Sequence, residues 1–167
     1  MLFEKQFVFY GTNAEHASAL WEGEKIFDRL YDLYLLAAVV GFINKRRDPV
    51  KKDTKVEKTI FAEILVNNKD TLGLLYRLVM LLDKEYEPVF DKRVDKAFRD
   101  FYDDKKNKKD FERFNDYVRG GVEIIYEELL GNPLTSDDDK VLRLKNLVDQ
   151  YSKFDGGIRD LIKTIDI

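Results

Sequence analysis

The most apolar stretch of the chain is Leu33-Tyr34-Leu35-Leu36-Ala37-Ala38-Val39-Val40-Gly41-Phe42-Ile43. A helix needs about 20 apolar residues to cross a bilayer, and this stretch has only about half of that length. It therefore predicts a buried helix and no membrane span. Apolar residues at spacings of three and four extend the pattern over residues 24–45 and cover nearly all sides of the helix, which is typical of a central helix.

Helical spacing of apolar residues recurs on both sides of this central helix. Three prolines, Pro49, Pro88 and Pro133, fall where the patterns stop, which is where proline is best tolerated. Asn13 and Ser136 precede two of the patterns as candidate helix caps. Besides the central helix, the spacing predicts helices over residues 14–22, 55–67, 68–85, 89–103, 109–130 and 136–153.

The first twelve residues follow a different pattern. Phe3, Phe7 and Phe9 stand at odd positions, as in a short strand or an extended arm with one apolar face. One strand does not form a sheet alone. We therefore expect residues 1–12 to lie across the helices or to pair with a partner protein.

Together these patterns predict an all-α protein. We expect residues 1–167 to form one domain, a single irregular bundle of six to eight helices with a short N-terminal extended arm. Gly156-Gly157 should end the last helix and leave residues 158–167 as a short tail.

Composition narrows the class of protein further. The chain has no cysteine, which excludes disulfides, thiolate metal ligands and a cysteine nucleophile. The N-terminus lacks the basic segment and apolar run of a signal peptide. Both observations favour a cytoplasmic protein.

Charge is distributed unevenly along the chain. Residues 44–58 hold seven basic and three acidic residues, a net charge of +4. The rest of the chain therefore has a net charge of −7, which gives −3 for the whole chain. Cations of this kind neutralise phosphates and release counterions. The residues predicted to contact nucleic-acid phosphates are Lys45, Arg46, Arg47, Lys51 and Lys52. The alternative is a solvated loop whose cations suit the end of the preceding helix.

Three other charged features have structural interpretations. A second basic run, residues 105–109, is flanked by acids and is typical of a surface turn. His16 is the only histidine, so it cannot form a di-metal site and is expected at the surface or in packing. Residues 137–139 are three aspartates at a helix start, which indicates capping rather than a metal site.

Aromatic and glycine residues supply two more expectations. Gly120-Gly121 inside a predicted helix indicates close helix packing or a kink. Aromatic side chains are enriched at protein interfaces. Five of them exceed the needs of the predicted core and are candidates for a partner surface: Tyr86, Phe90, Phe98, Tyr102 and Tyr117.

Residues 34–42 followed by residues 45–50 carry a resemblance to a known family. An apolar Ala-Ala-rich helix ends in Gly41-Phe42 and is followed by Lys45-Arg46-Arg47-Asp48-Pro49-Val50. This arrangement resembles a segment of small accessory proteins encoded beside bacterial DNA-phosphorothioation and phage-defence genes. The resemblance implies a prokaryotic accessory protein linked to DNA, and it transfers no catalytic residue.

The sequence contains no catalytic motif and none that binds a cofactor or a metal. The leading hypothesis is a non-enzymatic accessory or adaptor subunit of a bacterial DNA-processing or antiviral assembly. It would contact a protein partner through aromatics and nucleic acid through the five cations above. One alternative is a pure protein-interaction module or homodimer without nucleic acid. Another is a small enzyme with a site built from acids and His16.

Overall fold

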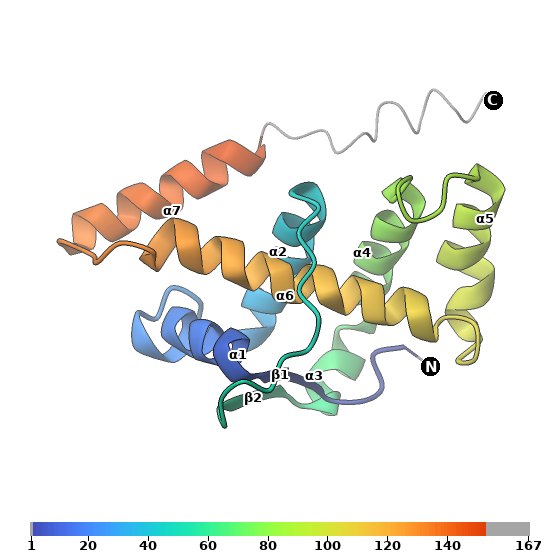
Figure 1. Cartoon of the computed structure of the whole chain (residues 1–167), viewed down its shortest axis with the longest axis horizontal. Coiled ribbons are helices and arrows are strands. Elements are labelled where there is room, and N and C mark those ends of the chain that lie inside the picture. Colours follow the sequence, from blue (N-terminus) through green and yellow to red (C-terminus); the bar gives the residue numbers. More distant parts are fainter. Residues whose placement is uncertain (1, 153–167) are drawn as a thin grey trace.

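The computed structural model describes residues 2–152, and most of these residues are helical (Figure 1). The predicted all-α class and irregular bundle are confirmed. Within the described part of the chain there are seven α-helices: α1 (Gly11–Ser18), α2 (Leu30–Ile43), α3 (Ala62–Asn67), α4 (Lys69–Leu82), α5 (Phe90–Val94), α6 (Lys108–Leu130) and α7 (Asp137–Ser152). Short π-helical and 3-10 turns extend α1 and α5: η1 (Ala19–Gly23), η2 (Asp95–Arg99) and η3 (Asp100–Tyr102).

Helix α6 is the longest element, with 23 residues, and lies in the middle of the fold (Figure 1). Helix α2 crosses α6 so closely that the backbones of the two helices are in contact. A Cβ atom added at Gly41 would lie 1.9 Å from the carbonyl oxygen of Tyr117, and one added at Gly121 would lie 1.9 Å from that of Ala37. The predicted close helix packing is therefore confirmed for Gly121 of the glycine pair.

The core surrounds this crossing. Tyr34 of α2, Tyr76 of α4 and Phe114 of α6 are fully buried, and the ring centroid of Phe114 lies 6.3 Å from that of Tyr34 and 5.8 Å from that of Tyr76. Leu33, Ala37 and Val40 of α2 are also fully buried, which matches the central helix predicted from the apolar stretch. None of the helices in residues 2–152 is long and apolar enough to cross a membrane.

The predicted helix over residues 55–67 is wrong in its first half. Residues Glu57–Ile60 form strand β2, which pairs antiparallel with β1 (Phe7–Tyr10), and the helix is confined to α3. Val56, Ile60 and Ile64 are spaced by four, and a spacing of four fits a strand, with period 2, as well as a helix. The N-terminal arm therefore pairs with its own chain, and Phe7 and Phe9 are buried as predicted.

Helix α2 starts later than predicted. Residues 24–29 are not helical, because the chain reverses direction after η1. The backbone of Lys25 is left-handed, with φ 50°, and the Ile26 N–H donates to the Leu20 carbonyl at 2.9 Å. The first residues of the predicted helix, 24–29, therefore lie in this turn and the segment after it.

Helix α1 starts earlier than predicted, and Asn13 is not its cap. The helix begins at Gly11, where φ is 62° and an added Cβ would lie 2.0 Å from Asp53 Oδ1. The Asn13 side chain points to α6, where its Nδ2 donates to the Arg119 carbonyl and to Glu123 Oε1.

Helix α7 is capped as predicted, since the Asp139 N–H donates to Ser136 Oγ at 3.1 Å. It folds back beside the end of α6 (Figure 1) and buries only Leu147. The predicted helix end at residue 153, the break at Gly156-Gly157 and the tail over 158–167 lie outside the described residues.

Candidate nucleic-acid interface

The predicted basic segment leaves α2 through a tight helix end. Lys45 adopts a left-handed conformation with φ 55°, its N–H donates to the Phe42 carbonyl, and the Arg46 N–H donates to the Gly41 carbonyl at 2.9 Å. These two bonds form a Schellman motif with lysine in the position that glycine usually occupies. They redirect the chain into an extended segment, residues 44–56, that we call the strap.

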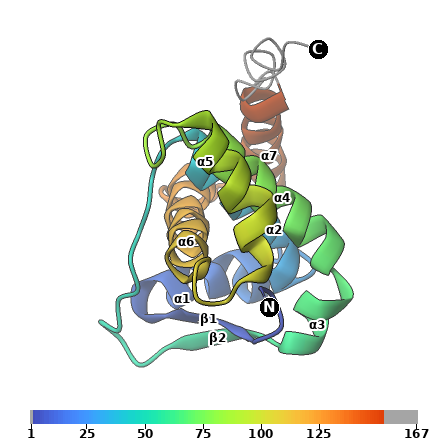
Figure 2. The same cartoon turned by 90° about the vertical axis from the view of Figure 1, so that its right-hand side faces the viewer.

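The strap passes over α6, which therefore lies between α2 and the strap (Figures 1 and 2). The Asp48 N–H donates to the Asp116 carbonyl at 2.9 Å, and Arg119 Nε donates to the Asp48 carbonyl at 2.8 Å. A Cβ atom added at Gly120 would lie 2.1 Å from the Arg46 carbonyl oxygen. The strap is thus held against the backbone of α6.

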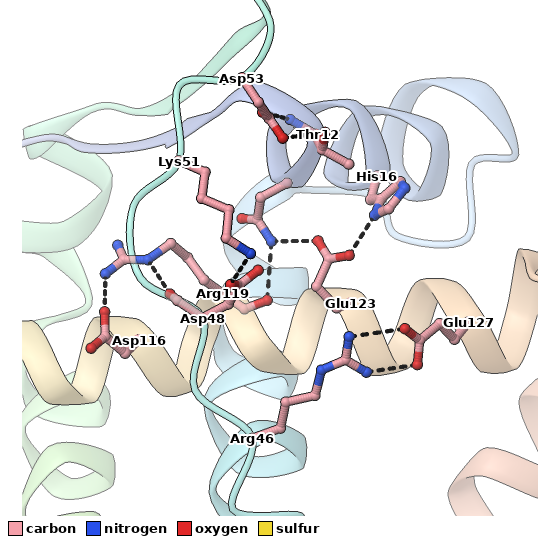
Figure 3. A network of polar contacts seen from close by, with 11 residues as sticks. Thr12, His16, Arg46, Asp48, Lys51, Asp53, Asp116, Arg119, Glu123 and Glu127 are labelled. Carbon is pink, nitrogen blue, oxygen red and sulfur yellow. Dashed lines mark hydrogen bonds and ion pairs between the residues drawn. The ribbon is translucent and has the colours of Figure 1, made fainter.

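Arg119 is the central anchor of the strap (Figure 3). Its guanidinium bonds the Asp48 carbonyl through Nε and the Asp116 carboxylate through Nη2, while the residue is only 5% exposed. A charge-assisted bond of this kind is stronger than a neutral one. Arg119 therefore fixes the strap at its middle.

The far end of the strap is tied to the start of α1. Asp53 accepts the Thr12 N–H and the Thr12 hydroxyl, both at 2.7 Å, and the Gly11 N–H donates to the Val56 carbonyl. The two bonds from Thr12 lower the pKa of Asp53 below its ordinary value. The strap is consequently held at both ends and in the middle.

A buried carboxylate joins α1 to α6 to one side of the strap (Figure 3). Glu123 accepts bonds from Asn13 on one oxygen and from His16 Nδ1 on the other, each at 2.8 Å. The His16 ring stacks on Tyr126 with centroids 3.7 Å apart. His16 therefore has the packing role that was one of its two expected roles.

Two of the five predicted phosphate contacts pair with acids of the protein itself at exposed positions. Lys45 forms an ion pair with Glu85, and Lys51 pairs with Asp48 at 2.6 Å. The hydrogen bond that Lys51 donates to Asp48 raises the pKa of Lys51. Acids of the protein itself therefore offset part of the positive charge of these two lysines.

Arg46 is engaged more strongly, because its guanidinium binds Glu127 on α6 in a bidentate manner, at 2.6 and 2.9 Å (Figure 3). The hydrogen bonds that Arg46 donates to Glu127 raise the pKa of Arg46 and lower the pKa of Glu127. This pair ties the start of the strap to α6.

The remaining two cations are accessible. Lys52 is exposed and lies over the ring of Tyr10, with Nζ 4.2 Å from the ring centroid. Arg47 is exposed, and no ion pair to another residue in the range 2–152 engages it. Arg47 is therefore available to meet an anion.

The structure brings Arg47 together with the second basic run. Arg47, Lys108 and Lys109, which we call the cationic cluster, line one surface cavity of about 460 Å³. Within residues 2–152, Lys108 and Lys109 are exposed and form no ion pair. Arg113 also lines the cavity, but it is bound to Asp83 at 2.6 Å.

The second basic run was expected to be cancelled by its neighbouring acids. Asp110 instead points inward, is 1% exposed, and accepts bonds from Tyr86 and Lys96 at 2.6 and 2.8 Å. Asp103 accepts the backbone N–H of Lys105. The carboxylate of Asp110 thus faces the interior while the lysines beside it face solvent.

The other candidates behave mainly as structural features. Asp139 accepts bonds from Thr135 and from Arg143, and these bonds lower its pKa. Among residues 2–152, no three His, Asp or Glu residues stand together as a metal site.

The five aromatic candidates divide by exposure. Tyr117 is buried and bonds Asp83, and Tyr86 and Phe90 are partly buried. Phe98 and Tyr102 are exposed, at 50% and 63%. These two aromatics remain available for a partner.

Comparison with known proteins identified one family. A family model described as DNA sulphur modification system-associated protein 4 matches residues 14–155. No curated protein and no solved structure matches the sequence.

Proposed function

The chain belongs to the family of DNA sulphur modification system-associated protein 4, and we propose that it is a non-enzymatic accessory subunit of that system that contacts DNA phosphates and a protein partner. The contact with DNA would be made by the cationic cluster. The family assignment supports the accessory role, since its model matches most of the chain.

The observation that carries the DNA contact is the convergence of Arg47 with Lys108 and Lys109. These residues come from two distant segments and line one cavity at the surface. Of the two acids in that cavity, Asp116 is bonded to Arg119, which leaves Glu112 to oppose three cations. Phosphates are the natural ligands of such a cluster, because lysine and arginine release the counterions that phosphates condense.

The strap would support this contact. Of the five residues predicted from the sequence, we propose Arg47 as the direct phosphate ligand and Lys52 as a cation at the margin. Lys45 and Arg46 would hold the start of the strap through Glu85 and Glu127, so that Arg47 stays beside α6, and Lys51 would pair with Asp48 within the strap.

The setting we propose follows from the family. Sulphur modification acts on DNA, so an accessory subunit would work in the cytoplasm of a bacterium, with antiviral defence as its purpose. The resemblance of residues 34–50 to phage-defence accessory proteins supports this setting.

A salt titration of DNA binding tests the contact. Three phosphate contacts predict a slope of log affinity against log salt of about −3, since each contributes about −0.9. Arg47→Glu combined with Lys109→Glu should reduce the slope to about −1 and weaken binding at every salt concentration. The measurement is fluorescence anisotropy of a labelled duplex with the purified full chain.

The matched control is Lys92→Glu combined with Lys145→Glu, which changes the net charge equally at two exposed lysines elsewhere. It should leave the slope near that of the unmodified chain. Equal losses in both double variants would show that only overall charge matters and would contradict the assigned site. No binding at low salt would favour the interaction module without nucleic acid.

A further inference from the structure

A second cavity, of about 550 Å³, lies between β1, the strap and α6. In the view of Figure 2, β1 runs below α6 with the strap to one side. Val8 and Tyr10 of β1, Val50 of the strap, and Asn115 and Arg119 of α6 line it.

One wall of this cavity is the free edge of the small sheet. Phe7 pairs with Ile60 and Phe9 with Lys58, and the Gly11 N–H donates to the Val56 carbonyl in the same register. In an antiparallel ladder alternate residues exchange hydrogen bonds, so Val8 turns its N–H and C=O away from β2. Val8 lines the cavity, and no other backbone group among the described residues bonds it.

The opposite wall offers two buried hydrogen-bond donors. Asn115 is 6% exposed; its Oδ1 accepts from the Tyr34 hydroxyl at 2.9 Å, and no described residue engages its Nδ2. Arg119 is 5% exposed and uses Nε and Nη2 on Asp48 and Asp116, which leaves Nη1 (Figure 3). Two donors at the base of a cavity suit a carboxylate.

We propose that an extended peptide of a partner protein binds in this cavity as a third strand on the free edge of β1, with a carboxylate held by Asn115 and Arg119. The inference rests on the protein contact of the proposed function and specifies its chemistry. An unpaired strand edge is the surface that β-strand addition uses, with main-chain bonds supplying affinity and side-chain pockets supplying specificity.

The distribution of charge supports a carboxylate at the base of the cavity. The acids that line it, Asp104 and Glu112, are exposed residues, as are Lys5 and Lys108, so the outer part of the cavity carries both signs. At its base, Asn115 Nδ2 and Arg119 Nη1 are donors, and the buried Asn107 uses its Nδ2 on the Phe101 carbonyl. A nucleotide would also meet those donors, but it has no main chain to pair with Val8.

The first test uses Val8→Pro in the full chain. Proline removes the N–H that faces the cavity and spares the bonds to β2, and edge positions tolerate it. The probes are short overlapping peptides that cover the other proteins of the modification system from the same genome. Peptides bound by the unmodified chain should bind Val8→Pro about tenfold more weakly. Val8→Thr keeps the N–H and should bind them normally.

The second test addresses the carboxylate. Asn115→Asp keeps an oxygen for the Tyr34 hydroxyl and replaces the free donor by a charged acceptor. Peptides whose acid is replaced by its amide, or whose C-terminal acid is amidated, should lose binding to the unmodified chain. With the Asn115→Asp variant, the same replacement of the acid by an amide should change peptide binding little.

Three results would overturn the inference: no peptide binds, Val8→Pro binds the peptides as well as Val8→Thr does, or deoxynucleoside monophosphates bind in the cavity in place of peptides. Circular dichroism checks that Val8→Pro is folded. DNA binding through the cationic cluster is measured separately on the same variants. Failure of the peptide site with intact DNA binding would therefore leave the proposed DNA contact standing, and the reverse result would leave the peptide site standing.

Discussion

Two segments of the chain meet the backbone of α6, and they do so in different ways. Helix α2 packs on it through uncharged residues, with Gly121 against the carbonyl of Ala37. The strap packs on it through polar and charged groups, with the adjacent Gly120 against the carbonyl of Arg46. Two neighbouring glycines thus serve a core contact and a surface contact.

The comparison separates what stabilises the fold from what positions its charges. Burial of apolar surface at the α2 crossing contributes about 25 cal/mol for each Å² removed from water. An exposed ion pair contributes about 0–1 kcal/mol. We therefore expect changes at the crossing to unfold the protein, and changes at the strap to alter where Arg47 lies.

The largest effect should follow Gly121→Val. Its side chain would meet the α2 backbone at a point where a Cβ atom already lies 1.9 Å from the Ala37 carbonyl. We expect a loss of about 4 kcal/mol in the free energy of unfolding, measured by urea denaturation. Gly23→Val is the control, because a Cβ atom there lies 3.8 Å from its nearest neighbour. Similar losses at both positions would mean that helix propensity, not the crossing, sets the effect.

Arg119→Met should be next in size. The change removes the buried anchor of the strap and leaves the Asp48 carbonyl and the Asp116 carboxylate without their donor. We expect a loss of about 2 kcal/mol in the free energy of unfolding. Arg99→Met removes an exposed pair with Asp95 and should cost close to nothing. Equal unfolding midpoints for the two variants would contradict the anchor role.

A smaller effect distinguishes the two glycines directly. Gly120→Ala should cost about 1 kcal/mol, because the extended strap can shift more easily than a packed helix. Gly121→Ala should cost more than that. The shift in Gly120→Ala should also move Arg47 and weaken DNA binding several-fold at low salt. A larger stability loss at residue 120 than at residue 121 would reverse the comparison.

The smallest effect concerns the pair between Arg46 and Glu127. Arg46→Gln should lower the free energy of unfolding by about 0.5 kcal/mol at neutral pH, because the pair is largely exposed. Arg46 lowers the pKa of Glu127 below its ordinary value of 4.5. The contribution is thus present above pH 4.5 and is lost as the pH falls through the lowered pKa. Denaturation at a series of pH values should show a shallower acid decline in Arg46→Gln than in the unmodified chain.

Helical spacing in the sequence correctly predicted the elements with long, one-sided apolar patterns, such as α4, α6 and α7. It misassigned residues 57–60 because the spacing of Val56, Ile60 and Ile64 fits two periods, and because the pairing strand lies some fifty positions earlier. The β-branched Thr59 and Ile60 were the local signal for a strand.

The sequence was enough to find the basic segment, but it could not show which of its cations pair with acids and which remain accessible. Arg46 meets Glu127, which the crossing of α2 and α6 brings near, and Lys45 meets Glu85, which follows the end of α4. From the sequence alone, Asp110 is expected to cancel the charge of the adjacent Lys109. A single position on a helix turns a side chain by about 100°, which is enough to send the aspartate inward and the lysine outward.

The position of the strap in the chain also determines the order in which parts of the structure can form during synthesis. Its middle is held by Asp116 and Arg119, which stand 68 and 71 positions after Asp48 in the chain. A ribosome releases residues 44–56 well before it has made α6. The middle of the strap therefore lacks its anchors until α6 has been made. By contrast, the residues of α2, of β1 and β2, and of the bonds from Gly11 and Thr12 to the far end of the strap are already present. The cationic cluster, which joins Arg47 of the strap to Lys108 and Lys109 of α6, therefore forms late in the synthesis of the protein.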